Sequence, residues 1–443
     1  MRLLRLTAAV SGGLRRSLAT AASHPPWGMM TRLVPADPAA QSANVHLAQP
    51  PRASDLCVPM HLVKTAPLPG PDSDLAQKVV GHVCASSGDG LLFLLYSDLR
   101  YVKRGADVDP LLAAAAGLTG RRIGRYDLTR FPDITRFVLN PLTHQLARLP
   151  DIACIPATKL VYGDRMGLLT QADRGHGPPD RFAIAVPEEG NLNVMLRFLS
   201  EKGEWENVAV SPCHLPSARE MVINQETLAL GGRLWFVDVT WGVVSADPFS
   251  DPPELSFTEL PRGSVLPDGA RHGKGVPVDY RRVGVSEGRL RYVEVSRKEP
   301  FVLSSFVLDK EGSGWTLQNR VALSKLWADG AGCPWLPLKE GKTPQIVLLD
   351  PLNASVVYLT VDERHVIVLD MNRKEVIGPY LYTGNSDYIP CVLPPWLGSS
   401  QIPYAVSQKK KLFSSKMPEK KKTLADDLVG SDILWKSSRF PKN

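Results

Sequence analysis

The feature that most constrains the fold is a strand–turn–strand unit that recurs across the middle of the chain. In each unit an apolar β-type run ends in a polar turn residue, and a second strand-like run follows after a few turn-forming residues. The units lie at 136–150, 196–210, 243–261, 305–323, 346–361 and 366–379. Their polar turn residues are Asn140, Ser200, Asp247, Asp309, Asp350 and Asp370.

The spacing of these turn residues indicates the architecture. They are separated by 60, 47, 62, 41 and 20 positions. Propeller blades repeat at roughly 40–50 residues, so the first four gaps suit successive blades and the last suits two hairpins of one blade. The sequence therefore predicts an all-β fold, a propeller-like array of four-stranded antiparallel blades. It does not predict an activity, because propellers host unrelated functions.

Individual hairpins can be placed within this pattern. Strand signals begin at Val79–Ala85, and the clearest pair is Leu234–Val239 with Trp241–Ser245. Glu287–Gly288 is expected to turn the chain between two further strands, since apolar and polar residues alternate along Leu290–Val295 after it. The best helix prediction is Asp109–Leu118.

Composition divides the chain into four parts. Pro and Ala are frequent before the first strand signals, and so much Pro excludes central strands, so we expect an extended lead-in with one strand near Cys57–Val63. A Lys-rich run at 408–422 cannot bury a core. The predicted parts are a transit peptide at 1–24, the lead-in at 25–75, the β domain at 76–395 and a disordered basic tail at 396–443.

The net charge of +7 is confined to the ends of the chain. Residues 1–36 hold five Arg and no acid, and residues 407–443 hold ten basic against four acidic residues. The body at 37–406 therefore carries a charge of −4. A basic balance points to nucleic acid only when it lies on the folded part, so we expect nucleic-acid binding only weakly, through Lys409–Lys422.

The N-terminal segment has the composition of an organellar address. It is rich in Arg, Ala, Leu and Ser, and Arg15–Arg16 lies shortly before a run of small residues. The many Arg, with comparatively few Ser or Thr, favour the mitochondrion over the plastid. An uncleaved basic tail is the alternative, and the Lys-rich run would then direct the chain to the nucleus or leave it in the cytosol.

Cysteine spacing and apolar runs favour a soluble protein in a reducing compartment. The six cysteines are widely spaced without a C-x-x-C pair, which indicates thiols rather than a disulfide framework. The longest apolar runs, Leu91–Tyr96 and Leu111–Leu118, are far below the roughly 18 residues that a membrane span needs.

Several segments carry a family resemblance. GRLWFVDVTWGVVSADPFSDPPELSFTELP at 232–261, VGVSEGRLRYVEV at 283–295, GWTLQNRV at 314–321 and IVLLDPLNASVVYLTV at 346–361 resemble the plant family called domain of unknown function 1618. The resemblance extends over roughly residues 25–395. It implies a β-propeller-like domain, similar to those that accompany F-box proteins and kelch repeats, without catalytic residues to carry over.

Three sets of residues are candidates for a catalytic or metal site. Gly284–Gly288 matches the G-x-S-x-G pattern around Ser286, but a strand follows instead of the helix that a nucleophile elbow requires. Asp238, Asp247, Asp350 and Asp370 lie at strand ends, where carboxylates of propeller glycosidases act. Asx-turn formation explains the same positions.

The possible zinc ligands are Cys57, His61, His82 and Cys84, whose spacings match no familiar zinc site. Repeated tryptophans at 205, 235, 241 and 315 favour blade packing over ligand stacking. We therefore expect a non-catalytic interaction scaffold with an unidentified protein partner, no cofactor and no metal. The alternatives are a propeller-type hydrolase and an organellar RNA-associated protein acting through the tail.

Overall fold

The computed structural model describes residues 24–67, 75–102, 133–152, 165–173, 175, 177–188, 191–211, 213, 215–216, 219–268, 277–312, 314–329, 343–361, 365–381 and 387–404. Every described residue belongs to one compact unit. The predicted transit peptide, the helix at Asp109–Leu118 and the Lys-rich run lie outside the described residues.

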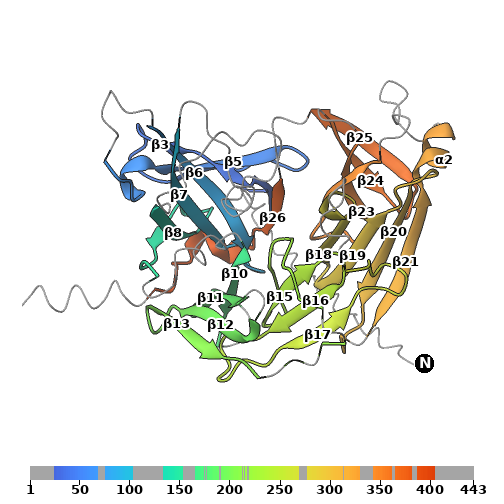
Figure 1. The fold of residues 1–443 in the computed structure, drawn as a ribbon. Helices are drawn as coiled ribbons and strands as arrows, with labels where there is room; N and C mark the ends of the chain where they lie inside the picture. Colours follow the sequence, from blue (N-terminus) through green and yellow to red (C-terminus); the bar gives the residue numbers. More distant parts are fainter. Residues whose placement is uncertain are drawn as a thin grey trace, which may run out of the picture. The chain divides into compact units, whose positions relative to one another are not determined.

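Five antiparallel sheets, here called blades 1 to 5, follow one another along the described chain (Figure 1). Blade 1 contains β2 (Leu33–Val34), β6 (Leu75–Ser86), β7 (Leu92–Val102), β8 (Asp133–Leu139) and β9 (Leu146–Arg148). Blade 2 contains β10 (Gly167–Gln171), β11 (Arg181–Glu188), β12 (Asn191–Leu199) and β13 (Glu204–Ala209). Blade 3 contains β14 (Leu228–Leu230), β15 (Arg233–Asp238), β16 (Gly242–Ala246) and β17 (Ser256–Glu259). Blade 4 contains β18 (Arg281–Ser286), β19 (Arg289–Val295), β20 (Val302–Leu308) and β21 (Trp315–Ala322). Blade 5 contains β22 (Gln345–Leu349), β23 (Val356–Thr360), β24 (His365–Asp370) and β25 (Glu375–Leu381).

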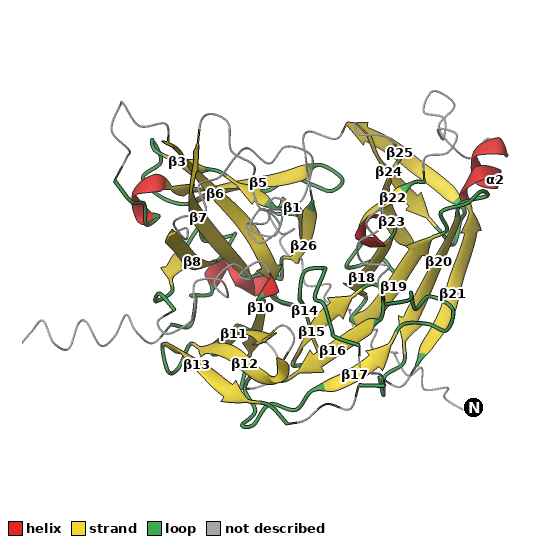
Figure 2. Ribbon diagram, in the orientation of Figure 1, coloured by secondary structure: helices red, strands yellow, loops and turns green. Residues whose placement is uncertain are grey.

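A sixth, mixed sheet, here called the closing sheet, joins the two ends of the described chain. It contains β1 (Trp27–Thr31), β3 (Ala36–Asp37), β4 (Asn44–His46), β5 (Ala53–Pro59) and β26 (Tyr388–Val392). β1 pairs antiparallel with β26 from Trp27 opposite Val392 to Thr31 opposite Tyr388. Figure 2 shows these two strands side by side.

The inner strands contact one another in a closed order. β6, β10, β14 and β18 follow in turn, β18 contacts β22, and β26 contacts both β22 and β6. The prediction of an all-β propeller of four-stranded antiparallel blades is confirmed, and the closing sheet completes the ring. Short helical turns connect these elements, namely η1 (Met60–Leu62), η4 (Pro277–Asp279), α2 (Leu323–Ala328) and η5 (Pro395–Ser399).

The turn residues identified from the repeat occupy equivalent places. Asn140 follows β8, the last but one strand of blade 1, and Ser200, Asp247 and Asp309 follow the last but one strands of blades 2 to 4. Asp370 ends the last but one strand of blade 5. Asp350 follows the first strand of blade 5, so the 20-residue gap does fall within one blade.

The expectation for residues 25–75 is wrong, because this segment contributes strands to the closing sheet and to blade 1. β1 to β5 all lie between Trp27 and Pro59, where a single strand was expected. The prolines fall mainly in the gaps between these strands, as at Pro35, Pro38 and Pro50–Pro51. Pro therefore limits the strands to a few residues without preventing their pairing.

The boundary expected at residue 395 is also too early. Leu397 and Ile402 are buried, and the side-chain amide of Asn140 donates to the carbonyl oxygens of Leu397 at 3.0 Å and Ser400 at 3.2 Å. The described chain up to Tyr404 therefore belongs to the folded unit.

Face-to-face stacking of blades places the core between sheets. Val243 and Val244, which point to opposite faces of β16, are both fully buried. The tryptophans join neighbouring blades: Trp205 Nε1 donates to Pro150 O at 2.9 Å, and Trp315 Nε1 donates to Glu259 O at 2.8 Å. This agrees with the blade-packing interpretation.

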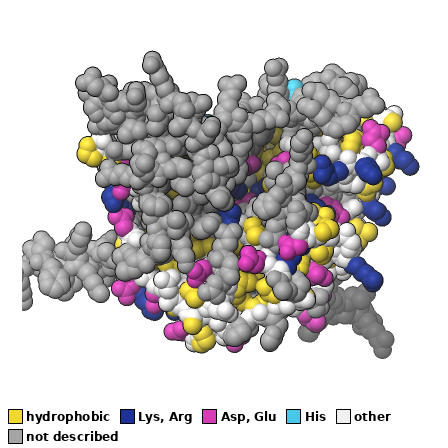
Figure 3. Space-filling model, in the orientation of Figure 1, with side chains coloured by type: hydrophobic (Ala, Val, Ile, Leu, Met, Phe, Trp, Pro, Cys, Tyr) yellow, Lys and Arg dark blue, Asp and Glu magenta, His cyan; other side chains and the backbone are white. Residues whose placement is uncertain are grey.

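Exposed basic side chains lie on or next to the outer strands of blades 4 and 5. Figure 3 shows basic side chains over the side where β20, β21 and β25 lie in Figure 1, and Arg320 on β21 and Lys374 next to β25 are exposed. Charged groups at an edge oppose pairing with another chain. Among the described residues, no helix has the length and apolar character to span a bilayer.

Candidate functional site

The strand-end carboxylates form local turns. Asp247 Oδ1 accepts the backbone N–H of Phe249 at 2.9 Å, and Asp350 Oδ1 accepts that of Leu352 at 2.8 Å. Asp370 Oδ1 accepts the N–H of Asn372 at 2.9 Å. This is the Asx-turn arrangement, in which the side chain replaces a backbone acceptor.

Asp238 serves the same kind of structural purpose in blade 3. Its side chain is buried and accepts the backbone N–H and the hydroxyl of Thr240 at 2.9 and 2.6 Å. It also accepts the side-chain amide of Asn224 at 3.2 Å. These donors fix the turn after β15 and occupy the carboxylate.

Ser286 is fully buried at the end of β18, and its hydroxyl donates to the carbonyl oxygen of Asp350 at 2.6 Å. The next residues turn directly into β19. A nucleophilic serine needs an exposed hydroxyl on a strand-to-helix turn. The residue instead joins the first hairpin of blade 4 to that of blade 5.

The four possible zinc ligands lie on three different elements. Cys57 is on β5, His61 is in η1, and His82 and Cys84 are both on β6. Cys84 Sγ lies 3.8 Å from the carbonyl oxygen of His82. In the described part of the chain, no group of three or more His, Cys, Asp or Glu side chains is arranged to hold a metal ion.

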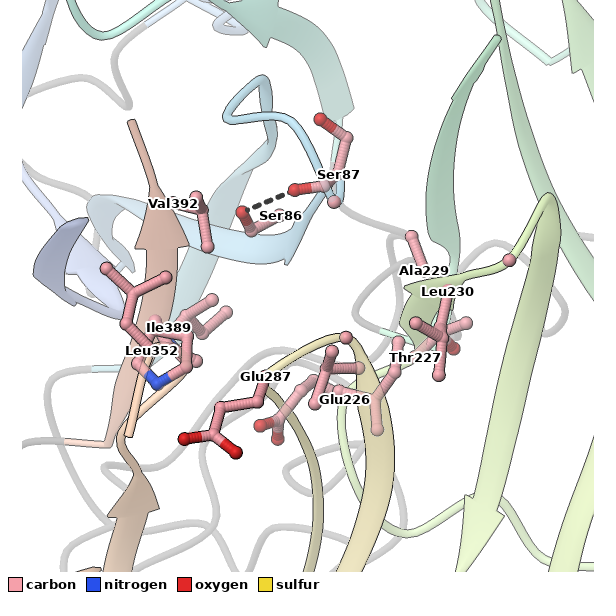
Figure 4. Close-up of a pocket in the computed structure, with 17 residues that line it drawn as sticks. Ser86, Ser87, Glu226, Thr227, Ala229, Leu230, Glu287, Leu352, Ile389 and Val392 are labelled. Carbon is pink, nitrogen blue, oxygen red and sulfur yellow. Dashed lines mark hydrogen bonds between the residues drawn. The ribbon is translucent and has the colours of Figure 1, made fainter. Parts of the chain in front are cut away.

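A cavity of about 540 Å³ lies among the first hairpins of the blades (Figure 4). Its lining comes from five sheets. Blades 1, 4 and 5 contribute residues around their first hairpin turns, at 86–88, 285–288 and 351–352. Blade 3 contributes β14 and the residues next to it, at 226–231, and the closing sheet contributes β26, at 389–392. Most of the lining side chains are apolar. Ligand cavities in proteins commonly measure 300–1,000 Å³ and are mostly apolar.

Glu226, which lines the cavity, belongs to a group of charges formed with Arg32 and Arg282, here called the hub triad. Glu226 is 6% exposed, lies 3.0 Å from Arg32 Nη2 through Oε2, and contacts Arg282 through Oε1. Burial opposes ionisation of Glu226, but the guanidinium groups of Arg282 and Arg32 outweigh it and hold its pKa below the ordinary value. The triad joins the closing sheet to blades 3 and 4.

Ser87 lines the cavity and is hydrogen-bonded to an acid next to it, Asp89. Ser87 Oγ and Thr170 Oγ1 each donate to Asp89 Oδ1 at 2.6 Å, and burial raises the pKa of Asp89. Cys391 is fully buried nearby, with its thiol 3.5 Å from Gly90 O. Burial raises the pKa of Cys391 to about 12, so its nucleophilic thiolate form is disfavoured at neutral pH.

The rim of the cavity carries Glu287 and Leu352. Figure 4 shows the Glu287 side chain on the same side as Glu226, and Leu352 and Ile389 on another side. Glu287 Oε1 accepts the backbone N–H of Ala354 at 3.3 Å. Burial raises the pKa of Asp350, and the charge of Glu287 adds to this shift.

Sequence reasoning missed the hub triad. Arg32 and Glu226 are 194 positions apart, and Arg282 is 56 positions beyond Glu226. None of the three belongs to a motif or to the repeat of turn residues. Only the closure of the ring brings them together.

Comparison with known proteins adds family information for part of the chain. No curated protein matches it. One similar solved structure is the β-propeller domain of Myceliophteria thermophila Cps50 (Swd1), with 7% identity, a TM-score of 0.29, and coverage of 65% of this chain and 82% of that one. Another is Zg3597, a family 117 glycoside hydrolase from Zobellia galactanivorans, with 12% identity, a TM-score of 0.26, and coverage of 59% and 74%. TM-scores this low carry no argument about function.

The family match falls on blades 3 to 5, where the sequence resemblance was most specific. It starts within β15 and ends within β24. Residues 235–367 match the model of the family described as "Protein of unknown function (DUF1618)", which confirms the resemblance over this segment.

Proposed function

We propose that this β-propeller is a non-catalytic interaction scaffold whose protein partner binds at the cavity among the first hairpins. The observation that carries the proposal is the cavity itself, which is mostly apolar and draws its lining from five sheets. Turns presented by a rigid scaffold are common binding positions. A partner seated there would contact several blades at once.

The state of the polar groups around the cavity supports binding rather than catalysis. A general acid or base needs a pKa near the working pH and access to substrate. Glu226 is ionised and paired with two arginines, and the Cys391 thiol is held in its protonated form. The strand-end Asp350 accepts backbone N–H groups of its own turn.

Site-specific photo-crosslinking tests the proposal. A benzoylphenylalanine at Leu352, which is 46% exposed on the rim, should crosslink a partner in cell extract. The same group at Leu317, which is 48% exposed on the outer strand of blade 4, is the matched control. The crosslinked protein is then purified and titrated against the wild type, Leu352→Asp and Leu317→Asp.

We expect Leu352→Asp to weaken binding at least about tenfold, because a charge would be desolvated at an apolar contact. Leu317→Asp should leave the affinity unchanged. A purified partner that binds Leu352→Asp normally would contradict the proposed surface. Turnover of a glycoside or ester panel that is lost in Glu287→Gln would contradict the non-catalytic assignment.

We also propose that residues 1–24 direct the protein to the mitochondrion. The support is the composition of residues 1–36, which contain five Arg and no acidic residue.

A further inference from the structure

The wall of the cavity is suited to an apolar side chain. Leu228, Val285, Ile389 and Val392 line it and are buried or half-buried. Leu352 also lines it, yet remains 46% exposed. Burial of such a rim residue by a bound partner removes apolar surface from water, which favours association.

Both guanidinium groups of the hub triad already have a partner. The carboxylate of Glu226 is shared between Arg32 and Arg282, and Arg282 also lies 3.4 Å from the carbonyl oxygen of Tyr388. An acidic side chain that entered the cavity would have to compete with Glu226 for these arginines, and a basic one would be repelled by them, so neither would recover its hydration energy in full. An aliphatic or aromatic side chain does not incur this cost.

Glu287 on the rim differs from Glu226 because its carboxylate can still accept hydrogen bonds. Its side chain is 53% exposed, and its nearest cation, Arg291 Nη2, is 3.9 Å from Oε2, beyond hydrogen-bonding distance. Its one described hydrogen bond is that from Ala354 N, and a carboxylate can accept about four. The nearby Asp350 carboxylate adds to the negative potential, since the charge of Glu287 helps to raise its pKa.

We infer that the cavity receives an extended segment of the partner protein in which an aliphatic or aromatic side chain enters the cavity and a neighbouring Lys or Arg pairs with Glu287. This inference rests on the proposed function above and adds the chemistry of the partner. The apolar wall selects the inserted side chain. The rim carboxylate selects the basic neighbour through charge complementarity, which contributes more to specificity than to affinity.

Peptide selection with a charge reversal tests the inference. Phage-displayed random dodecapeptides are selected on the purified full-length chain, with counter-selection on Leu352→Asp to keep cavity binders. The same selection is run on Glu287→Lys. The matched control is Glu311→Lys, which reverses an exposed charge between β20 and β21, outside the cavity lining. Circular dichroism confirms that each variant is folded.

On the wild type and on Glu311→Lys, we expect enrichment of Lys or Arg beside Leu, Ile, Phe or Trp. On Glu287→Lys, enrichment should change to Asp or Glu beside the same apolar residues. A wild-type peptide, measured by fluorescence anisotropy, should bind Glu287→Lys about fivefold more weakly, as expected for loss of an exposed ion pair.

Different results would overturn the inference alone or the proposed function with it. Peptides that need Leu352 but show no charge preference, or bind Glu287→Lys unchanged, would overturn the inference and leave the proposed function standing. If no selected peptide depends on Leu352, both the inference and the proposed surface are overturned.

Discussion

The pH dependence of folding should report the buried His82. This residue lies on β6 opposite Leu33, is 5% exposed, and its Nε2 has no hydrogen-bond partner. Burial lowers its pKa from 6.5 to about 4, and the positive charge of Arg32 adds to this shift, while Asp387 opposes it. The folded protein therefore keeps this imidazole neutral where the unfolded chain protonates it.

The difference between the His82 pKa values of the folded and unfolded chain makes the free energy of unfolding depend on pH. Between pH 6.5 and 4 the unfolded chain binds about one more proton than the folded chain at this position, so stability is complete above pH 6.5 and is lost as the pH falls. One pKa unit corresponds to about 1.36 kcal/mol, so the free energy of unfolding should fall by about 3 kcal/mol across this range. Between pH 6 and 5 the slope should be about 1 kcal/mol per unit.

Urea unfolding followed by tryptophan fluorescence at several pH values from 5 to 7 measures this slope. His82→Gln is expected to lower stability at every pH but to flatten the slope by about 1 kcal/mol per unit. His46→Gln, at an exposed position on β4, is the control and should retain the wild-type slope. Equal slopes for the wild type and His82→Gln would refute the reasoning.

Four other outcomes are expected. Glu226→Gln leaves the buried Arg282 and the half-buried Arg32 without the Glu226 carboxylate and should cost about 3–5 kcal/mol in denaturant unfolding; a loss below about 1 kcal/mol would contradict this. Arg136→Met should raise stability by about 1 kcal/mol, because Arg136 is buried with Nε and Nη2 lacking hydrogen-bond partners; marked destabilisation would show that its contact with the Trp205 ring, 5.8 Å from Cζ to the ring centroid, dominates. Trp315→Phe removes the hydrogen bond to Glu259 O and should cost about 1 kcal/mol, measured against Trp315→Tyr. A C-terminal fusion in cells should run about two kilodaltons short and label mitochondrial matrix proteins if residues 1–24 are cleaved on import; a full-length nuclear or cytosolic product would exclude this.

For the candidate site, the sequence showed only which residues have a local structural role, and it did not show the cavity. Asp247, Asp350 and Asp370 precede turns in the sequence and accept the N–H groups of those turns in the structure. This local chemistry depends on residues two or three positions apart, so it is readable without a fold. The cavity is not readable in this way, because its lining comes from five sheets.

The sequence by itself determined the blades, because strand pairing between chain neighbours depends on alternation and turn chemistry that recur locally from Asn140 to Asp370. The tertiary structure alone decided how the ring closes and what lies at its centre. The pairing of Trp27 with Val392 and the contact of Arg32 with Glu226 join residues far apart in the chain. The closing strands leave no periodic signal in the sequence because they are short and interrupted by Pro. The charged residues belong to no motif, and only closure of the ring brings them together.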